Sequence, residues 1–197
     1  MGNKLAIFVC GSGGSGKTTF VNQHFGLFRQ VNVDIPYEEL LNNSGLGLKI
    51  NEFNSTDLTK SAEFFERAKD ISYATLMESI EMGENIVIDS IGRNSDYVFQ
   101  QRKQLKLNGY DTVMFMLYAP LELCIDRVKS RNRVYDESIT IDSWYLSYDN
   151  IVNFKKEFSD DFYLVFSEEN VDWDQKISNI IQKKKLNTNI NQKDKYL

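Results

Sequence analysis

The sequence contains few cysteines, prolines and histidines. Its 197 residues include 2 cysteines, 2 prolines and 1 histidine. Cys10 lies in an apolar run and Cys124 in an amphipathic segment, which predicts buried thiols in a reducing compartment rather than a disulfide framework. Scarce proline argues against a disordered or collagen-like chain. The 42% of hydrophobic residues suffices for the core of one globular domain.

The sequence also lacks a net positive charge and a long apolar run. A formal net charge of −5 argues against sequence-independent binding to nucleic acid or to anionic membranes, although a local basic patch is compatible with it. No apolar run approaches the ~18 residues that cross a bilayer. The first residues lead directly into an apolar run and do not resemble a signal peptide. We therefore expect a cytoplasmic protein without a membrane partner.

Five short runs rich in Val, Ile and Phe are present. They are continuously apolar, which is typical of strands buried on both faces. The runs lie at residues 5–10, 31–34, 85–89, 112–118 and 162–166. Segments with helical spacing separate them, and this alternation predicts an α/β fold with a parallel sheet and helices on both faces. In such a fold a ligand binds at the carboxyl ends of the strands.

The chain has no internal repeat, and residues 1–185 are predicted to form a single domain. Residues 43–59 are polar and include Gly45 and Gly47, which predicts a mobile flap. Residues 186–197 form a polar stretch that we expect to be a frayed tail.

The stretch GSGGSGKT, residues 11–18, matches the pattern G-x-x-x-x-G-K-T. A Gly/Ser linker has a similar composition, but here a strand enters the motif and a helix leaves it. Small residues allow backbone N–H groups to surround a phosphate, Lys17 reaches the β and γ oxygens, and the Thr18 hydroxyl binds Mg²⁺. We expect ATP and Mg²⁺ as cofactors. The predicted nucleotide-binding residues of the loop are Gly11, Ser12, Gly13, Gly14, Ser15, Gly16, Lys17, Thr18 and Thr19.

Two acidic residues end other predicted strands. Asp34 ends the second and Asp89 the third, so a parallel sheet brings both to the edge that holds the loop. Asp89 suits a carboxylate that holds Mg²⁺ through water, and Asp34 suits a base that accepts a proton from an attacking hydroxyl. Alternatively Asp34, two residues before Pro36, caps a helix, and Asp89 accepts local loop N–H groups. We expect both carboxylates in the substrate site.

Basic residues follow in two later segments. In CIDRVKSRNR, Arg127 and Arg131 are spaced to share one helical face, and Arg133 lies just beyond. An arginine on a mobile lid stabilises the charge of a transferred phosphoryl group, whereas a solvated basic helix end is the alternative. We predict a lid at residues 127–142, with Arg127 and Arg131 catalytic together with Lys17, and Arg133 at the nucleotide.

Arg93 follows the third strand in DSIGRNSD, where Gly92 allows a tight turn. Its guanidinium could hold phosphate or sugar oxygens of the acceptor in a bidentate manner, so Arg93 is a predicted substrate-binding residue. An exposed arginine without a ligand is the alternative.

The order of these motifs resembles the zeta-toxin and polynucleotide-kinase group of small P-loop kinases. The resemblance covers residues 4–166 and is carried by GSGGSGKT, VNVD, NIVIDSIGR and CIDRVKSRNR, followed by IDSWYLSYDNIVNFKKEF. It implies a nucleoside-monophosphate-kinase-like fold with strand order 2-3-1-4-5. It also implies Lys17 and Thr18 at the nucleotide, Asp34 as the base, and Arg131 at the transferred phosphate.

Within that group the layout is similar to phage hydroxymethylpyrimidine DNA kinases, which phosphorylate 5-hydroxymethyluracil in DNA during base hypermodification. The stretches VNVDIPYEELLNNSGLGL and IDSIGRNSD carry this similarity. It implies ATP-dependent transfer of the γ-phosphoryl group to DNA containing 5-hydroxymethyluracil. Arg93, Arg102, Lys103 and Lys106 would then form a basic patch for the DNA.

Other functions remain open at this point. Zeta toxins that phosphorylate UDP-N-acetylglucosamine carry EGTGR in the loop after the third strand, where this chain has Ile91 in place of threonine. The loss of that hydroxyl makes a sugar nucleotide a poorer fit. A kinase of 5′-hydroxyl polynucleotide ends and a nucleotide-dependent binding protein without an acceptor are the further alternatives.

Overall fold

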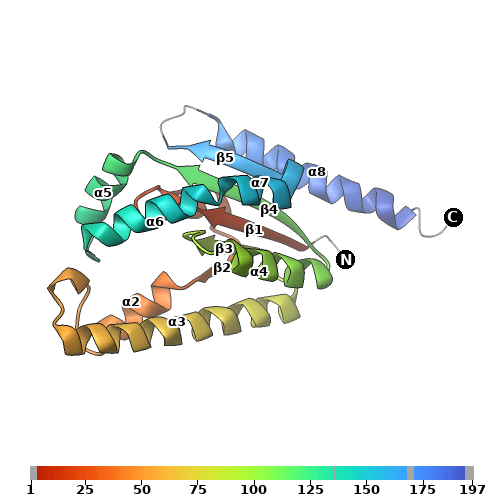
Figure 1. The fold of residues 1–197 in the computed structure, drawn as a ribbon. Helices are drawn as coiled ribbons and strands as arrows, with labels where there is room; N and C mark the ends of the chain where they lie inside the picture. The colour runs from red at the N-terminus through yellow and green to blue at the C-terminus, as the bar shows by residue number, and fades with distance from the viewer. Residues whose placement is uncertain (1–3, 135, 168–170, 194–197) are drawn as a thin grey trace.

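The computed structural model describes residues 4–134, 136–167 and 171–193, with side chains up to residue 184. Five parallel strands form one sheet between two layers of helices (Figure 1). The strands are β1 (Lys4–Cys10), β2 (Arg29–Asn32), β3 (Ile86–Ser90), β4 (Tyr110–Tyr118) and β5 (Phe162–Phe166). Their order is β2-β3-β1-β4-β5, which confirms both the α/β class and the predicted order 2-3-1-4-5.

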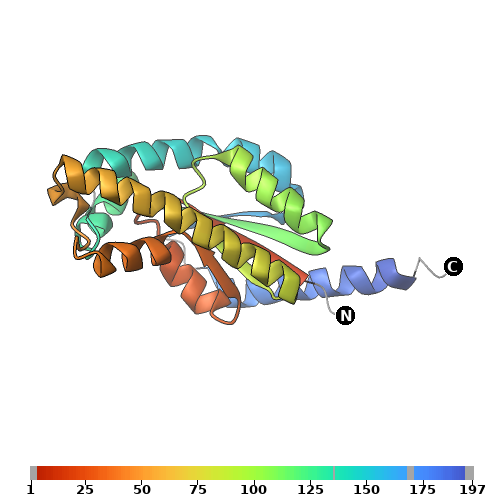
Figure 2. The same ribbon diagram turned by 90° about the horizontal axis from the view of Figure 1, so that it is seen from below.

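The helices connect successive strands or follow the last one. They are α1 (Lys17–Phe25), α2 (Asp34–Asn43), α3 (Ser55–Met82), α4 (Ser95–Leu107), α5 (Leu121–Lys129), α6 (Glu137–Asp149), α7 (Ile151–Phe158) and α8 (Trp173–Lys193). Short 3-10 turns occupy Ile50–Glu52 and Ser159–Asp161. Figure 2 shows α3 crossing beneath the sheet with α2 packed beside it. Within the described ranges, no helix combines the length and the apolar character needed to span a membrane.

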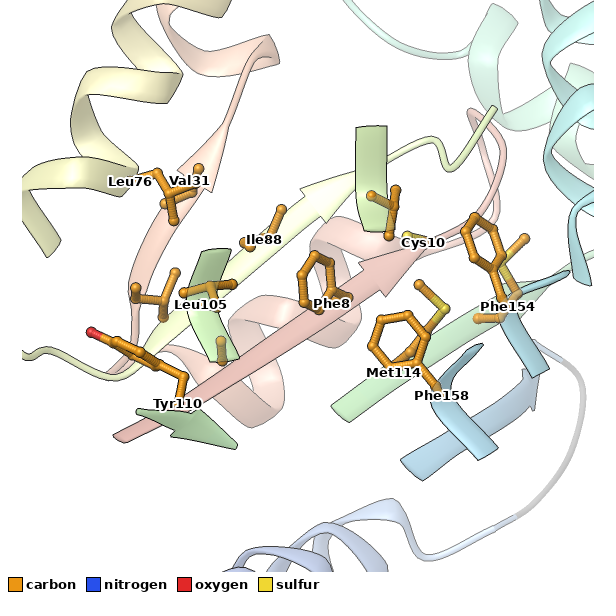
Figure 3. Close-up of a cluster of buried hydrophobic side chains, with 14 of the residues drawn as sticks. Phe8, Cys10, Val31, Leu76, Ile88, Leu105, Tyr110, Met114, Phe154 and Phe158 are labelled. Carbon is orange, nitrogen blue, oxygen red and sulfur yellow. The ribbon is translucent and has the colours of Figure 1, made fainter. Parts of the chain in front are cut away.

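The core lies on both faces of the sheet. Successive side chains of a strand point to opposite faces, so every second residue of β1 contacts the same helical layer. Phe8 lies in a cluster with side chains of α3, α4 and α7, including Phe154 (Figure 3). Ile7 lies in a second cluster with side chains of α1 and α8, including Phe25. Burial on both faces explains why the strands read as continuous apolar runs.

The second strand lies two residues earlier than the sequence predicts. The sequence indicates residues 31–34, whereas β2 ends at Asn32 and Asp34 is the first residue of α2. The Asn32 side chain accounts for the early turn, because its Oδ1 accepts the backbone N–H groups of Asp34 and Ile35. These N–H groups have no partner inside the helix, so a side-chain acceptor stabilises the helix start.

The predicted flap is shorter than residues 43–59. Ser55–Thr59 form the beginning of α3, which starts there because Asn54 Oδ1 accepts the N–H of Asp57 at 3.0 Å. The rest of the segment is joined to the lid, since the N–H of Val134 donates to the Leu48 carbonyl at 3.1 Å.

The C-terminal stretch also differs from the expected frayed tail, because α8 continues through Lys193. A helix that an amphipathic segment has nucleated propagates through polar residues with little further cost. Residues 194–197 lie outside the described part of the chain.

Arg102 is not part of the expected basic surface patch. Arg102 is buried, its guanidinium donates to Glu157 and Thr112, and it lies 4.4 Å from the centre of the Phe158 ring. A buried, paired guanidinium is part of the core and offers no charge to a surface ligand.

Candidate active site

The loop of residues 11–18 connects β1 to α1 at the carboxyl edge of the sheet. Lys17 Nζ donates to the carbonyls of Gly11 and Ser12, at 2.8 and 2.9 Å, so the ammonium group lies over the loop. Gly14 has φ +82° and lies against the backbone of Cys124 in α5, where a Cβ atom would collide. The loop therefore requires glycine at position 14 both for its conformation and for its contact with α5.

A cavity of about 630 Å³ opens beside this loop. Ser15, Thr19 and Arg127 line it, together with the start of α8. This volume lies in the range of small-molecule and cofactor sites. The Ser15 hydroxyl is buried without a hydrogen-bond partner among the described residues. A buried polar group of this kind requires a partner, and a phosphate oxygen of a nucleotide would supply one.

The lid arginines occupy different places. Arg127 Nη1 donates to the Gly14 carbonyl at 3.1 Å. Arg131 is exposed and lies beyond Lys129, the last residue of α5. The prediction that Arg127 and Arg131 share one helical face is therefore wrong. Arg131 lines the first cavity and also a second one.

The second cavity, of about 160 Å³, lies at the carboxyl ends of β2 and β3. It brings together Thr18, Asp34, Asp89 and Arg131, as predicted, and also contains Arg133. The remaining lining residues are Val21, Asn22, Gln30, Asn32, Ile35 and Glu38. A hydroxyl, carboxylates and guanidinium groups therefore converge on a space about the size of one small ring.

Asp89 is held by its neighbour on β2. Asn32 Nδ2 donates to Asp89 Oδ2 at 3.0 Å. Burial raises the pKa of Asp89, the charge of Lys17 opposes this shift, and the nearby carboxylate of Asp34 adds to it. The carboxylate is thus desolvated, with cations and an amide donor supporting its charge.

Thr18 and Asp89 fit a magnesium ion. A hydroxyl and a carboxylate are hard oxygen ligands, and both side chains line the same cavity. Among the described residues no group of three His, Cys, Asp or Glu side chains forms a metal cage. Mg²⁺ in phosphoryl-transfer sites uses few protein ligands and completes its shell with water and phosphate oxygens, so this donor set is sufficient.

Arg133 contacts Asp34 and Glu38 in the second cavity. Its Nη2 lies 3.0 Å from Asp34 Oδ1, and its Nη1 lies 3.0 Å from Glu38 Oε1. Its side chain is only 11% exposed, and the guanidinium lies 5.9 Å from the centre of the Tyr37 ring. The structure thus places Arg133, which we expected at the nucleotide, in the second cavity and next to the predicted base.

Arg93 lies apart from both cavities. Its side chain is exposed, and its backbone carbonyl accepts a hydrogen bond from Asn150 Nδ2 at 3.1 Å. Gly92 has φ +76° and packs against Cys10 and Phe154, which fixes the turn before Arg93. The predicted contact of Arg93 with an acceptor stays a prediction.

Asn32 and Glu38 are functional candidates that sequence reasoning missed. Asn32 contacts Asp89 at the end of β3 and Asp34 at the start of α2, and Glu38 shares Arg133 with Asp34. Asn32 lies inside the predicted strand 31–34, and its only sequence signal was an amide side chain two residues before an acidic residue. The signal for Glu38 was its place four residues after Asp34, one helical turn away.

No curated protein matches the sequence in a direct comparison. Solved structures share the fold. A chain of the AvrRxo1-ORF1:AvrRxo1-ORF2 complex with ATP has a TM-score of 0.66 at 14% identity, covering 85% of this chain and 55% of that chain. A chain of the PezAT chromosomal toxin–antitoxin system of Streptococcus pneumoniae has a TM-score of 0.57 at 15% identity, covering 92% and 86%. A chain of the Pnkp1/Rnl/Hen1 RNA repair complex has a TM-score of 0.53 at 13% identity, covering 78% and 47%.

This chain therefore spans about half of the AvrRxo1 and Pnkp1 complex chains that it matches. At these identities the similarity shows the fold, which is that of a P-loop kinase. The family model described as AAA domain (AAA_33) matches residues 7–144, more than half of the chain, including the phosphate loop and the lid arginines. The chain belongs to this family of P-loop proteins.

Proposed function

We propose that the protein is an ATP-dependent, magnesium-requiring kinase that transfers the γ-phosphoryl group to a hydroxyl. One observation carries the proposal: Arg131 lines both the cavity beside the phosphate loop and the cavity that contains Asp34 and Asp89. A phosphoryl group passes between a donor and an acceptor at one point, and an arginine at that point stabilises the charge of the transition state. A protein that only binds Mg·ATP would still use Thr18 and Asp89, but it would have no reacting hydroxyl for Asp34 to serve.

The residues have separate roles in this reaction. Asp34 accepts the proton of the acceptor hydroxyl as that oxygen bonds to the γ-phosphorus, and the bond to the β–γ bridging oxygen breaks to release ADP. Lys17 and Arg131 face the negative charge of the phosphoryl oxygens. Thr18 and Asp89 would hold Mg²⁺, which when bound neutralises phosphate charge.

Two contacts of the present structure must change before transfer. The Lys17 ammonium donates to loop carbonyls, and it would exchange these for phosphate oxygens. Asp34 is ion-paired with Arg133, and the acceptor hydroxyl would take a place beside this carboxylate. The side chain of Asp34 is 48% exposed, which leaves its second oxygen within reach of an acceptor.

For the acceptor we propose the 5-hydroxymethyl group of 5-hydroxymethyluracil in DNA. The resemblance of the strand-end and lid segments supports it, and so does a second cavity of about 160 Å³, large enough for one pyrimidine ring. Gln30 Nε2 donates to Asn22 Oδ1 at 3.4 Å in this cavity, and the remaining donors and acceptors of the two amides would be available to a base edge. The buried Arg102 leaves Arg93, Lys103 and Lys106 as the candidates for backbone contacts.

A second acceptor class is a 5′-hydroxyl polynucleotide end or a small metabolite such as a nucleotide sugar. The names of two structural neighbours, an RNA repair complex and a toxin–antitoxin system, favour testing these acceptors in parallel.

The experiment is transfer of label from γ-phosphate-labelled ATP in the presence of Mg²⁺. The acceptors are DNA with 5-hydroxymethyluracil, DNA with thymine, a 5′-hydroxyl oligonucleotide and UDP-N-acetylglucosamine. Asp34→Asn is compared with Glu39→Gln, a matched change of an exposed carboxylate on the same helix.

Label in the modified DNA alone, lost in Asp34→Asn and kept in Glu39→Gln, supports the proposal. Label in another acceptor would support kinase activity and identify a different substrate. ATP binding with no labelled product from any hydroxyl contradicts the kinase.

A further inference from the structure

The Asn32 side chain contacts both candidate carboxylate residues. Its Nδ2 donates to Asp89 Oδ2 at 3.0 Å, and its Oδ1 accepts the backbone N–H groups of Asp34 and Ile35, the latter at 3.1 Å. Both ends of one amide group are therefore engaged, one by the side chain of Asp89, which would hold the metal, and one by the backbone of the predicted base.

The sheet explains this arrangement. Asn32 and Asp89 are register partners at the ends of the parallel strands β2 and β3, so their side chains lie side by side. Two residues after Asn32 the chain enters α2, whose first N–H groups point back at the strand end. An amide carries a donor and an acceptor on one rigid plane, whereas a carboxylate has no donor and a hydroxyl does not reach both groups.

We propose that Asn32 is a positioning residue of the active site, an inference that rests on the proposed function. Its amide fixes Asp89 and the start of α2, and thereby Asp34, in one geometry. Because Asn32 occupies Oδ2 of Asp89, the second oxygen of this carboxylate would be the one available to support a bound Mg²⁺.

A merely structural role for Asn32 would be to cap α2. The two roles separate in Asn32→Ser, because a serine hydroxyl accepts the helix N–H groups nearly as well as asparagine does but is too short to donate to Asp89. Asn32→Ala removes both contacts. Asn54→Ser is the matched control, since Asn54 makes the same kind of cap at the exposed start of α3.

The test has three readouts: the midpoint of thermal unfolding, the kcat of phosphoryl transfer with its dependence on Mg²⁺ concentration, and the dissociation constant of Mn²⁺ for the ADP complex by electron paramagnetic resonance. Partners that orient ligands of a metal contribute about 10- to 100-fold to metal affinity or activity. In Asn32→Ser we expect kcat to fall and the Mn²⁺ dissociation constant to rise by about this factor, with an unchanged unfolding midpoint. In Asn32→Ala we expect the same changes together with a lower unfolding midpoint. In Asn54→Ser we expect the wild-type kcat and the wild-type Mn²⁺ dissociation constant.

Wild-type kcat and wild-type Mn²⁺ affinity in Asn32→Ser would overturn the proposal and leave Asn32 as a helix cap. If that variant unfolds, Asn32→Thr carries the same expectation, because its β-branched side chain suits a strand end and also caps. The Mn²⁺ measurement needs no acceptor. Failure of the wild type to phosphorylate any hydroxyl would therefore count against the proposed function, and unchanged Mn²⁺ affinity in the variants would count against the role of Asn32.

Discussion

Arg133 and Asp34 form an ion pair, with Nη2 and Oδ1 3.0 Å apart, although they lie about a hundred positions apart in the sequence. The pair joins the lid to the first turn of α2, and Glu38 binds the same guanidinium. In this state the predicted base is already neutralised by a cation. If Asp34 is the base, an acceptor hydroxyl would compete with Arg133 for its carboxylate.

Loss of this pair should loosen the lid without unfolding the protein. In Arg133→Met we expect faster cleavage by a protease within residues 130–136, because the lid loses its ties to α2. Both carboxylate partners are half exposed, so each pair should contribute about 0.2–1 kcal/mol to stability, and we expect the unfolding midpoint to fall by only a few degrees. Lys129→Met, which removes a solvent-exposed pair with Glu137, is the control. Equal cleavage rates in the two variants would show that Arg133 does not restrain the lid.

Lys17→Met should remove phosphoryl transfer. Removal of one hydrogen-bond donor aimed at a transition state typically lowers the rate about 10²- to 10³-fold, and a cationic donor should cost at least this much. We expect a loss of this size in kcat/KM for ATP, measured as initial rates of label transfer, with an unchanged unfolding midpoint. Lys60→Met, an exposed lysine of α3, is the control. A loss of less than about tenfold in Lys17→Met would contradict its role at the phosphates.

Gly14→Ala should destabilise the protein more than Gly45→Ala. Both glycines have nearly the same φ, +82° and +81°, so the two variants share the strain of that conformation. A Cβ atom at position 14 meets the backbone of Cys124, whereas one at position 45 meets nothing within 4 Å. Overpacking costs about 1–3 kcal/mol, which we expect as the difference in free energy of unfolding between the variants, measured by urea denaturation. Equal losses would mean that the loop and α5 separate easily.

The free energy of unfolding should fall at high pH because the buried thiol of Cys10 ionises more easily in the unfolded chain. Burial raises the pKa of its thiol from 9.0 to about 12. Folding thus favours the protonated thiol, and the resulting stability is fully present below pH 9 and is lost as the pH rises towards about 12. From pH 9 to 10 the free energy of unfolding should fall with a slope that approaches about 1.4 kcal/mol per pH unit, the value for one proton lost on unfolding. Urea denaturation of the wild type and Cys10→Ala should give diverging pH profiles; parallel profiles would contradict the assignment.

Much of the fold could be predicted from the sequence because its determinants are local. Continuous apolar runs identified the strands, and the loop GSGGSGKT identified the turn between β1 and α1. The end of β2 was misplaced because the amide of Asn32, a side-chain effect, ends the strand before Asp34. The start of α3 and the continuation of α8 were also not predicted, because both segments are polar in composition.

The site was predicted in part for a related reason. Thr18 was predicted from the phosphate-loop motif, and Asp34 and Asp89 from the rule that parallel strands bring their carboxyl ends together. The pairing of Arg133 with Asp34, and the burial of Arg102 against Glu157, depend on how distant elements pack, which spacing along the chain does not encode.

The contacts between α5 and the phosphate loop determine where the lid can bend. Arg127 is hydrogen-bonded to the Gly14 carbonyl, and Ser12 Oγ lies 3.4 Å from Cys124 Sγ, so α5 and the loop form one rigid body on the donor side. If the predicted lid closes on substrate, we expect its hinge after Lys129, with the segment that carries Arg131 and Arg133 as the part that moves. Nucleotide would then bind against a preformed wall, and only the proposed acceptor side would depend on closure.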